Sequence, residues 1–401
     1  KFTSSRFWKW VSHLLYIGHY SIKKIRQAYG YGTEKKDLCS GRVSFLADSE
    51  FKYHEYEQWI KHFAIEDRTQ MPKKGTRMYD PAYKVRTLID LFNDALKKHR
   101  QPGAYVSVDE MLREYRGRTT MIMKMPNKKG AGIGLKLWAL AESLGKRRLL
   151  RLDLYCGKKG MENAKMKNLA TKVVLKLLKP YLIEAMGIRC LSTDNYYTSV
   201  ELALILLYKY GVQSIGAIKM RGRGGRKGFP AELKAERVTT STDDAGNDFS
   251  SSDSNSDGGD SSSDSDSSSD SDSSSDSGSP LGKGKALKKR FPKGSYTFRV
   301  MPYDKLRSFL DTDESKCKGN PVSLLATAWH DNKLSCILST ISDPCMVDWM
   351  RRGKGNKYKE IKKPSANVLY SAVMDAVDVA DRHLTDIHLK IQTSKWYFNI
   401  F

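Results

Sequence analysis

Tyr105-Val-Ser-Val-Asp109-Glu110 is the stretch that decides how this sequence folds, because an apolar run rich in valine ends there in two carboxylates. Short valine-rich runs are typical of buried strands. Residues 188–194 repeat the pattern and end at Asp194, and in a third segment Ala376-Val377 precede Asp378. We expect the first two segments to be strands that carry an aspartate at the tip, and the third to be a helix.

Three aspartates from distant parts of a basic chain are what a two-metal phosphoryl-transfer site needs. Mg²⁺ and Mn²⁺ take oxygen ligands, and a pair of such ions clamps the attacking and leaving oxygens of a phosphodiester. Asp109, Asp194 and Asp378 are therefore the predicted catalytic residues and metal ligands. Two alternatives stay open: Asp109 as a turn residue at a strand end, and Asp194 or Asn195 as a helix N-cap.

The charge of the chain favours a polyanionic partner. The formal net charge is +24, and residues 239–282 hold 11 Asp but no Lys or Arg, so the rest of the chain carries +35. Such an excess attracts the phosphate backbone of nucleic acids. A basic surface without a partner is the alternative, and no long apolar span or basic amphipathic helix indicates a membrane. Six scattered cysteines without a CxxC pair fit a reducing intracellular compartment better than a disulfide frame or a zinc ribbon.

The 401 residues divide into regions of different character. Helical apolar spacing marks residues 1–100, and after Tyr105 the pattern predicts the order β-β-β-α-β-α-β, which indicates an α/β fold. Residues 239–282 are mostly Ser and Asp, cannot bury a core, and are predicted to be disordered. Short strands are expected again at 295–301, 324–329 and 333–339.

The residues around the three aspartates resemble the piggyBac-type transposases in five ordered words. Residues 108–118, VDEMLREYRGR, resemble the family's "VDEQ…FRGR", and GLKLWAL at 134–140 resembles "GIKIWAL". TDNYYTSVELA at 193–203 is similar to the family's "DNFFTSxxLA". The match continues in order through 216–233 and reaches MDAVDVAD at 374–381, which resembles "MGGVDxxDQ". Weaker resemblance extends toward both ends of the chain, including Lys395-Trp396.

This resemblance implies a cut-and-paste DNA transposase with an RNase H-like core. On that basis 1–100 is a helical region for dimerisation or DNA binding, 101–220 and 361–401 form the RNase H-like core, and 221–360 is an inserted β-rich domain. The disordered acidic segment 239–282 interrupts that insertion. The resemblance further implies Mg²⁺ or Mn²⁺ as cofactor, transposon ends and TTAA targets in double-stranded DNA as partners, a homodimer or larger assembly, and a nuclear location.

Several further residues are expected to support the site. Asp381 and Asn195 lie beside two of the aspartates, and the resemblance gives Asp381 a supporting role. Arg116 and Arg118 suit phosphate clamping, although a solvated surface pair is equally simple. A flexible basic loop would follow a DNA backbone, or would be only a connection; its basic residues are Arg221, Arg223, Arg226 and Lys227. The Ser-x-x-Asp spacings of 250–279 suit an acidophilic kinase, with an inert linker as the alternative.

The fifth word, MDAVDVAD at 374–381, departs from the family pattern, and the departure keeps a second function open. Asp375 and Ala376 stand where the family has two glycines, and Arg382 stands where it has a glutamine. Asp375 adds a carboxylate one helical turn from Asp378, and Arg382 is expected to offset it in part. The chain begins at Lys1 and ends at Phe401, so we expect it to be a fragment. The alternatives are a domesticated or decayed copy that binds DNA without cutting it, and, less favoured, a general RNA-binding protein.

Overall fold

The computed structural model describes most of the chain outside the acidic segment. The described residues are 2–31, 41–76, 78–125, 132–157, 169–183, 186–218, 294–301, 324–331, 334–353, 357–385 and 395–399. The predicted acidic segment 239–282 and the basic loop at 221–227 lie outside these residues. No helix in the described ranges has the length and apolar character needed to cross a bilayer.

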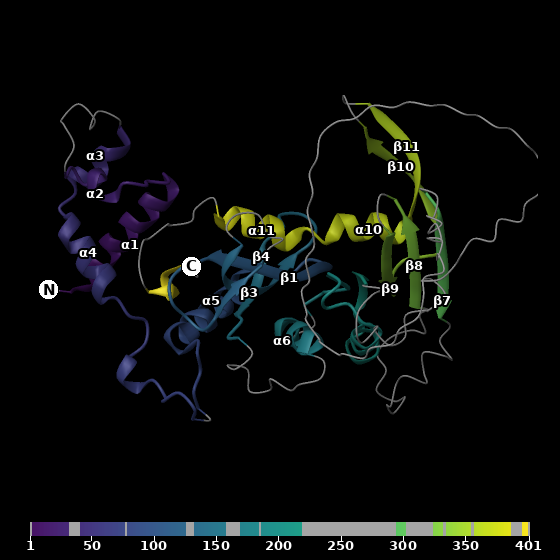
Figure 1. Ribbon diagram of the computed structural model, residues 1–401, viewed down its shortest axis with the longest axis horizontal. Helices are drawn as coiled ribbons and strands as arrows, with labels where there is room; N and C mark the ends of the chain where they lie inside the picture. The colour runs from purple at the N-terminus through teal and green to yellow at the C-terminus, as the bar shows by residue number, and fades with distance from the viewer. Residues whose placement is uncertain are drawn as a thin grey trace, which may run out of the picture.

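Four helices form a module at the N-terminus, at the left of Figure 1. They are α1 (Ser4–His19), α2 (Ile25–Ala28), α3 (Gly41–Asp48) and α4 (Tyr53–His62). Aromatic residues at helical spacing fill the space between them: Trp10 is 2% exposed, and its ring stacks on that of Trp59 with centroids 5.7 Å apart. The apolar spacing therefore predicted the helices of this region correctly.

A buried histidine makes this module sensitive to acid. The two ring nitrogens of His13 contact the hydroxyl groups of Tyr29 (2.7 Å) and Ser49 (3.0 Å). Burial, and then the charge on Lys9, lower the pKa of His13 from 6.5 to about 4. Because the unfolded chain takes up this proton at a higher pH than the folded chain, the contribution of His13 to stability is complete above pH 6.5.

We expect this contribution to be lost as the pH falls from 6.5 to about 4, at a cost of up to about 3 kcal/mol, since each pKa unit is worth about 1.4 kcal/mol. Urea unfolding of the full chain, followed by tryptophan fluorescence at pH 7 and pH 4.5, measures the loss. The variant His13→Asn serves as the control, because it has no titrating ring. An equal pH dependence in both proteins would contradict the assignment.

The centre of the molecule is a mixed sheet to which the described residues contribute nine strands. Along the sheet the order is β2-β3-β1-β5-β6-β9-β8-β7, and β4 also pairs with β3. The parallel pairs are β1 with β5 and β5 with β6, while β3 and β4 run antiparallel to their neighbours. The strand bounds are β1 (Tyr105–Glu114), β2 (Ile122–Lys124), β3 (Ile133–Glu142), β4 (Leu149–Leu154), β5 (Cys190–Thr193), β6 (Gln213–Ala217), β7 (Tyr296–Met301), β8 (Leu324–His330) and β9 (Leu334–Ser339).

Helices cover both faces of this sheet (Figure 1). One face packs against α6 (Leu169–Ile183) and α7 (Val200–Leu204), which is followed by a π-helical turn at Ile205–Lys209. The opposite face packs against α5 (Arg86–His99), α10 (Ser365–Val373) and α11 (Ala376–Thr385). Successive residues of β1 alternate between these faces, with Val108 in the core under α6 and Met111 in the core under α11.

Side chains close the outer edge of β4, where strand pairing would otherwise leave backbone groups open. The amide group of Asn93 on α5 donates to the carbonyl of Leu152 and accepts from its N–H, both at 2.9 Å. The hydroxyl group of Tyr181 on α6 donates to the carbonyl of Leu150 at 2.6 Å. The edge is therefore satisfied within the chain rather than left as a template for another strand.

We expect Asn93→Leu to lower the free energy of unfolding by about 3 kcal/mol. The substitution leaves the buried N–H and the buried carbonyl of Leu152 without hydrogen-bond partners, and each unsatisfied group costs about 1–3 kcal/mol. Asn93 is 2% exposed, so water cannot replace its two hydrogen bonds. Denaturant unfolding at neutral pH gives the difference. The matched control on the same helix is Asp94→Leu at an exposed position, where a change within about 0.5 kcal/mol is expected. Equal effects of the two substitutions would show that the contacts of Asn93 are not the cause.

The segment around Trp396–Asn399 joins the helical module to the sheet domain. Trp396 and Tyr397 pack in the core beneath α5 and α11, whereas Phe398 packs against the aromatic residues of the module. The Lys395 ammonium group donates to the carbonyls of Ile60 (2.8 Å) and Phe63 (3.1 Å) at the end of α4, where the helix dipole favours a cation. The last described segment of the chain therefore packs against the N-terminal helical module.

The strand predictions were correct in position but incomplete. The three strands predicted to follow Tyr105 before the first helix correspond to β1, β3 and β4. The prediction missed β2, and it missed a two-stranded ribbon formed by β10 (Met346–Arg352) and β11 (Tyr358–Pro364). The prediction that β1 ends at Asp109 is wrong, because β1 continues to Glu114 in antiparallel pairing with the equally long β3.

Candidate nucleic-acid cleavage site

Two of the three predicted aspartates occupy neighbouring positions on adjacent strands. The parallel pairing of β1 with β5 ends with Val108 opposite Thr193, so the next residue on each strand is Asp109 and Asp194. Asp194 follows the last residue of β5, as predicted, whereas Asp109 lies inside β1. The carboxylates therefore come together at the point where the two strands separate.

Asp109 belongs to the face of the sheet that α10 and α11 cover. The Ser107 hydroxyl group donates to the carbonyl of Met374 at 3.2 Å, and the Ser192 hydroxyl group contacts the Met374 sulfur atom at 3.4 Å. Because side chains alternate along a strand, Asp109 shares the face of Ser107. Met374 lies between α10 and α11, so this junction lies over the sheet where the two aspartates meet.

The electrostatics of nearby tyrosines agree with this placement. Burial raises the pKa of Tyr370 on α10, and the charges on Asp194 and Asp109 raise it further. Burial also raises the pKa of Tyr197, with Glu110, Asp109 and Asp194 as the contributing charges. The charges of both aspartates thus raise the pKa of two tyrosines from different elements, as expected if Asp109 and Asp194 are neighbours.

A tight turn holds the carboxylate of Asp194. Its Oδ1 accepts from the backbone N–H groups of Tyr196 (2.8 Å) and Tyr197 (3.4 Å), and its carbonyl accepts from the Thr198 hydroxyl group at 2.7 Å. The cap of helix α7 is instead Ser199, whose side chain accepts from the N–H of Leu202 at 3.1 Å. Asp194 therefore caps the turn rather than the helix, and the turn orients it.

A glycine on the neighbouring strand makes room for this turn. A Cβ atom at Gly216 would lie 2.1 Å from the Thr198 hydroxyl oxygen and 2.9 Å from the carbonyl oxygen of Thr193. Both atoms belong to the strand end and turn that carry Asp194. Any larger residue at 216 would displace the turn.

A buried network on the reverse face of β1 escaped the sequence analysis. Glu110 accepts from the ammonium group of Lys136 on β3 and from the Tyr197 hydroxyl group (3.2 Å). Lys136 also lies over the ring of Tyr196, 5.3 Å from its centroid. The network joins β1, β3 and the turn after β5 behind the aspartates. The available signal was positional, since Glu110 and Lys136 each lie within one of the family words and face the same side of paired strands.

Asp378 lies in the first turn of α11 with an exposed side chain, while its neighbours Val377 and Ala380 are buried against the sheet. Within the described parts of the chain, no three His, Cys, Asp or Glu side chains lie close enough together to hold a metal ion. The strand register therefore places Asp109 beside Asp194, but the three predicted aspartates do not form a metal cluster in this structure.

Two ion pairs tie the carboxylates beside Asp378 to the sheet domain. Asp381 pairs with Arg113 of β1, and Asp375 pairs with Arg147 of the β3–β4 loop at 3.0 Å. Arg382 was expected to offset the charge of Asp375 in part; the structure adds a direct ion pair with Arg147, which comes from a loop that only the fold brings near α11. Asp381 thus acts on the position of α11 through β1.

The remaining predicted residues are placed at the margins. Asn195 is half-buried in the turn after β5, and Arg116 and Arg118 are exposed in the loop that follows β1. The basic residues at 221–227 lie outside the described residues.

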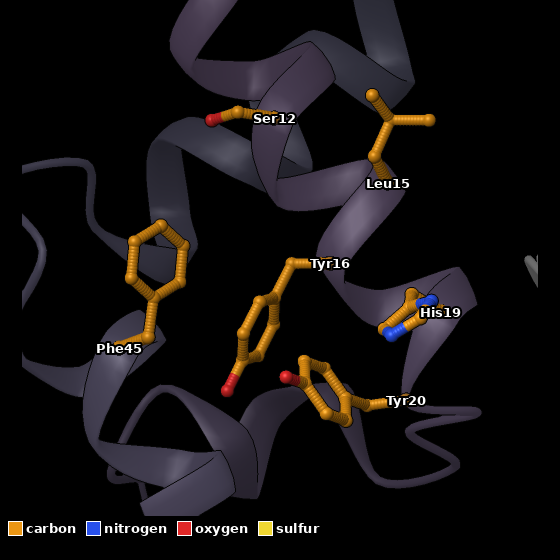
Figure 2. A pocket seen from close by; sticks show the side chains of 6 residues that line it. All are labelled: Ser12, Leu15, Tyr16, His19, Tyr20 and Phe45. Atoms are coloured by element: carbon orange, nitrogen blue, oxygen red, sulfur yellow. The ribbon is translucent and has the colours of Figure 1, made fainter.

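A surface hollow of about 410 Å³ lies elsewhere, on the helical module, where the Tyr16 ring is 4.5 Å from that of Tyr20 and 4.7 Å from that of Phe45 (Figure 2). The side chains that line this hollow include no carboxylate, so it is separate from the predicted aspartate site.

Comparison with known proteins agrees with this architecture. A family described as Transposase IS4, of the DDE type, matches residues 48–254, just over half of the chain. The chain belongs to this transposase family. A piggyBac transposase, solved by cryo-EM as a synaptic complex with hairpin DNA, has a similar fold, with a TM-score of 0.63 and 18% sequence identity. That similarity covers 100% of this chain and 63% of the other, so the chain spans less than two thirds of that transposase. Comparison with curated proteins gave no significant match. The predicted resemblance to piggyBac-type transposases is confirmed.

Proposed function

We propose that this transposase-family chain cleaves DNA strands and transfers them at transposon ends, in a reaction that depends on Mg²⁺ or Mn²⁺. The observation that carries the proposal is the meeting of Asp109 and Asp194 at adjacent positions of parallel strands, reached from segments far apart in the sequence. Carboxylates converge in this way where a cation offsets their repulsion. Their oxygen donors suit a hard divalent ion.

The strand order supports a finer assignment of the core. In the run β4-β3-β1-β5-β6, β3 is antiparallel to both of its neighbours, and β4, β1, β5 and β6 run in the same direction. This is the arrangement that we propose to be RNase H-like. We further propose double-stranded DNA with TTAA targets as the partner, a homodimer or larger assembly, and a nuclear location. An acidophilic kinase acting on 250–279 completes the proposal, in line with the Ser-x-x-Asp spacing.

The chain's own residues would hold and orient the reacting groups. Asp109 and Asp194 would bind the metal, which supplies Lewis-acid stabilisation of charge at the phosphodiester. The backbone N–H groups of Tyr196 and Tyr197 hold Asp194 in place. Arg116 and Arg118 would contact phosphates beside the site. Asp378 would complete the ligand set from α11.

A second candidate is a DNA-binding protein without cleavage activity. The observation that favours it is the position of Asp378, exposed and outside any three-residue metal cluster among the described residues. The ion pair of Asp375 with Arg147 adds a tie beside it that the family's glycine could not make. This candidate requires only the basic surface and not the third carboxylate.

A plasmid-nicking assay with and without metal tests the first proposal against the second. Supercoiled DNA that carries TTAA sites should be nicked in Mg²⁺ or Mn²⁺, and excess EDTA should reduce nicking to background, because the carboxylates alone cannot stabilise the developing charge. Binding of the same plasmid in EDTA is the control. Binding without nicking under any metal condition would favour the second candidate.

A further inference from the structure

The β10–β11 ribbon is the part of the fold that the cleavage site leaves unexplained. It is a separate two-stranded sheet and pairs with no other described strand. In Figure 1 it rises beyond the end of the main sheet, on the side where α10 lies. Asp109 belongs to that same side. The ribbon therefore extends from the end of the main sheet that β7, β8 and β9 form.

Contacts near both ends of the ribbon fix it to the end of the main sheet, through Lys363 near its base and Arg351 near its turn. The guanidinium group of Arg351 forms a two-pronged pair with Asp331 at the end of β8, with N–O distances of 2.6 and 2.9 Å. The ammonium group of Lys363 lies 5.8 Å from the ring centre of Trp329 and 5.2 Å from that of Trp349. Forked pairs and cation–π contacts set direction as well as distance. The ribbon therefore points in a defined direction before any partner binds.

Positive charge is concentrated on the outer half of the ribbon. Arg351 lies directly opposite Lys359, and Arg352 lies opposite Tyr358. Arg352, Lys357 and Lys359 are all exposed. Asp331 offsets the charge of Arg351, so the exposed cations of this half are Arg352, Lys357 and Lys359. A polyanion is the partner that such a group attracts.

Exposed apolar side chains accompany these charges. Met350 is 58% exposed and Tyr358 is 62% exposed. The register places them on the same face as diagonal neighbours, since Met350 lies opposite Glu360, two residues after Tyr358. Arg352 shares this face, because it lies opposite Tyr358, whereas Lys359 belongs to the other face with Arg351. The apolar pair and Arg352 are suited to face a groove and its phosphate edge, while the long lysine side chains reach phosphates beside it.

We propose that the outer half of the β10–β11 ribbon binds duplex DNA, with Arg352, Lys357 and Lys359 on the phosphates and Tyr358 and Met350 against the groove. The major groove, about 12 Å wide, accepts a two-stranded ribbon. The inference deepens the proposed function, on which it rests for duplex DNA as the partner. It does not depend on the carboxylates.

The test is the salt dependence of DNA binding by the full chain. A labelled duplex of about 30 base pairs and random sequence is titrated by fluorescence anisotropy between 50 and 200 mM salt. The triple variant Arg352→Ala, Lys357→Ala, Lys359→Ala should lower the slope of log K against log salt by about 2.7, at about 0.9 per phosphate contact. Affinity at 100 mM salt should fall by about 100-fold.

A matched triple variant separates a local contact from net charge. Lys98, Lys179 and Lys209 are exposed lysines on α5, α6 and the turn after α7, and their replacement by Ala removes the same charge. This control should leave the slope within about 0.5 of the parent, and the thermal midpoint of each variant verifies folding. A second pair, Met350→Ala with Tyr358→Ala, should weaken binding by about 10-fold without changing the slope, because an aromatic contact with a base is worth about 1–3 kcal/mol.

Three results would overturn the inference. The ribbon triple and the control triple could lower the slope equally, which would show general charge attraction. The ribbon triple could bind DNA as the parent does. It could also lose affinity for a duplex RNA of the same length while keeping its affinity for DNA, which would assign the ribbon to RNA. None of these results bears on nicking, so a failure of the ribbon inference is distinguishable from a failure of the cleavage proposal.

Discussion

Asp194→Asn is expected to lower plasmid nicking by about 1,000-fold or more, and Asp109→Asn is expected to do the same. Each substitution keeps the shape of the side chain and removes the negative charge that would hold a divalent ion. Metal stabilisation of a phosphodiester transition state is worth several kcal/mol, and each 1.36 kcal/mol is tenfold in rate. Initial rates of nicking in Mg²⁺, at protein concentrations above the plasmid, give the ratio.

The fold should survive both substitutions. In Asp194→Asn the side-chain oxygen can still accept from the N–H of Tyr196, so the turn after β5 is kept. Plasmid binding in EDTA should be unchanged or slightly tighter, because one negative charge is lost from a surface that meets phosphates. The control on the same strand is Glu114→Gln, whose side chain is exposed at the end of β1. Nicking that persists in either aspartate variant would remove that residue from the site.

The meeting of Asp109 and Asp194 could be predicted from the sequence because it depends on local signals. Each residue follows a run of buried strand residues, Val106 and Val108 in one case and Cys190 and Leu191 in the other. Parallel strands place equivalent positions side by side. The pairing itself came from the resemblance, since composition alone indicated only an α/β fold.

The β10–β11 ribbon could not be predicted in the same way. Its sequence has no alternating apolar face, because charged residues occupy both sides of the strands. What holds it is tertiary: the fork of Arg351 to Asp331 and the stack of Lys363 on two tryptophans. Hydrophobic periodicity shows which face of an element is apolar, but it does not show contacts between residues that are far apart in the sequence.

The surroundings of Asp378 show a similar limit. Its helix was predicted correctly, and the structure has α11 beginning at Ala376. The ion pair of Asp375 with Arg147 was not predicted, because Arg147 comes from a distant loop. Spacing along one helix predicts which side chains share a face, but it cannot predict which loop of the sheet approaches that face.

Asp378→Ala decides between an active transposase and a binding protein, and we expect it to abolish nicking by about 1,000-fold in Mn²⁺ while plasmid binding survives. The carboxylate would complete the ligand set but is exposed in the first turn of α11, so its removal should leave the core intact. Asp375→Gly restores the family's residue and should leave nicking equal or higher, because it removes a second negative charge beside Asp378.

The opposite pattern of results is equally informative. The unmodified chain could bind plasmid and never nick it, while Asp375→Gly combined with Ala376→Gly gains nicking. The loss of activity would then lie in the segment 374–381 alone. If nicking persists in Asp378→Ala, the third ligand is another carboxylate of this region. Asp375 would then be the first residue to test, because its ion pair with Arg147 is more exposed than the pair of Asp381 with Arg113 of β1. Asp381→Asn should therefore lower stability before it affects nicking, since it leaves the largely buried Arg113 without its partner.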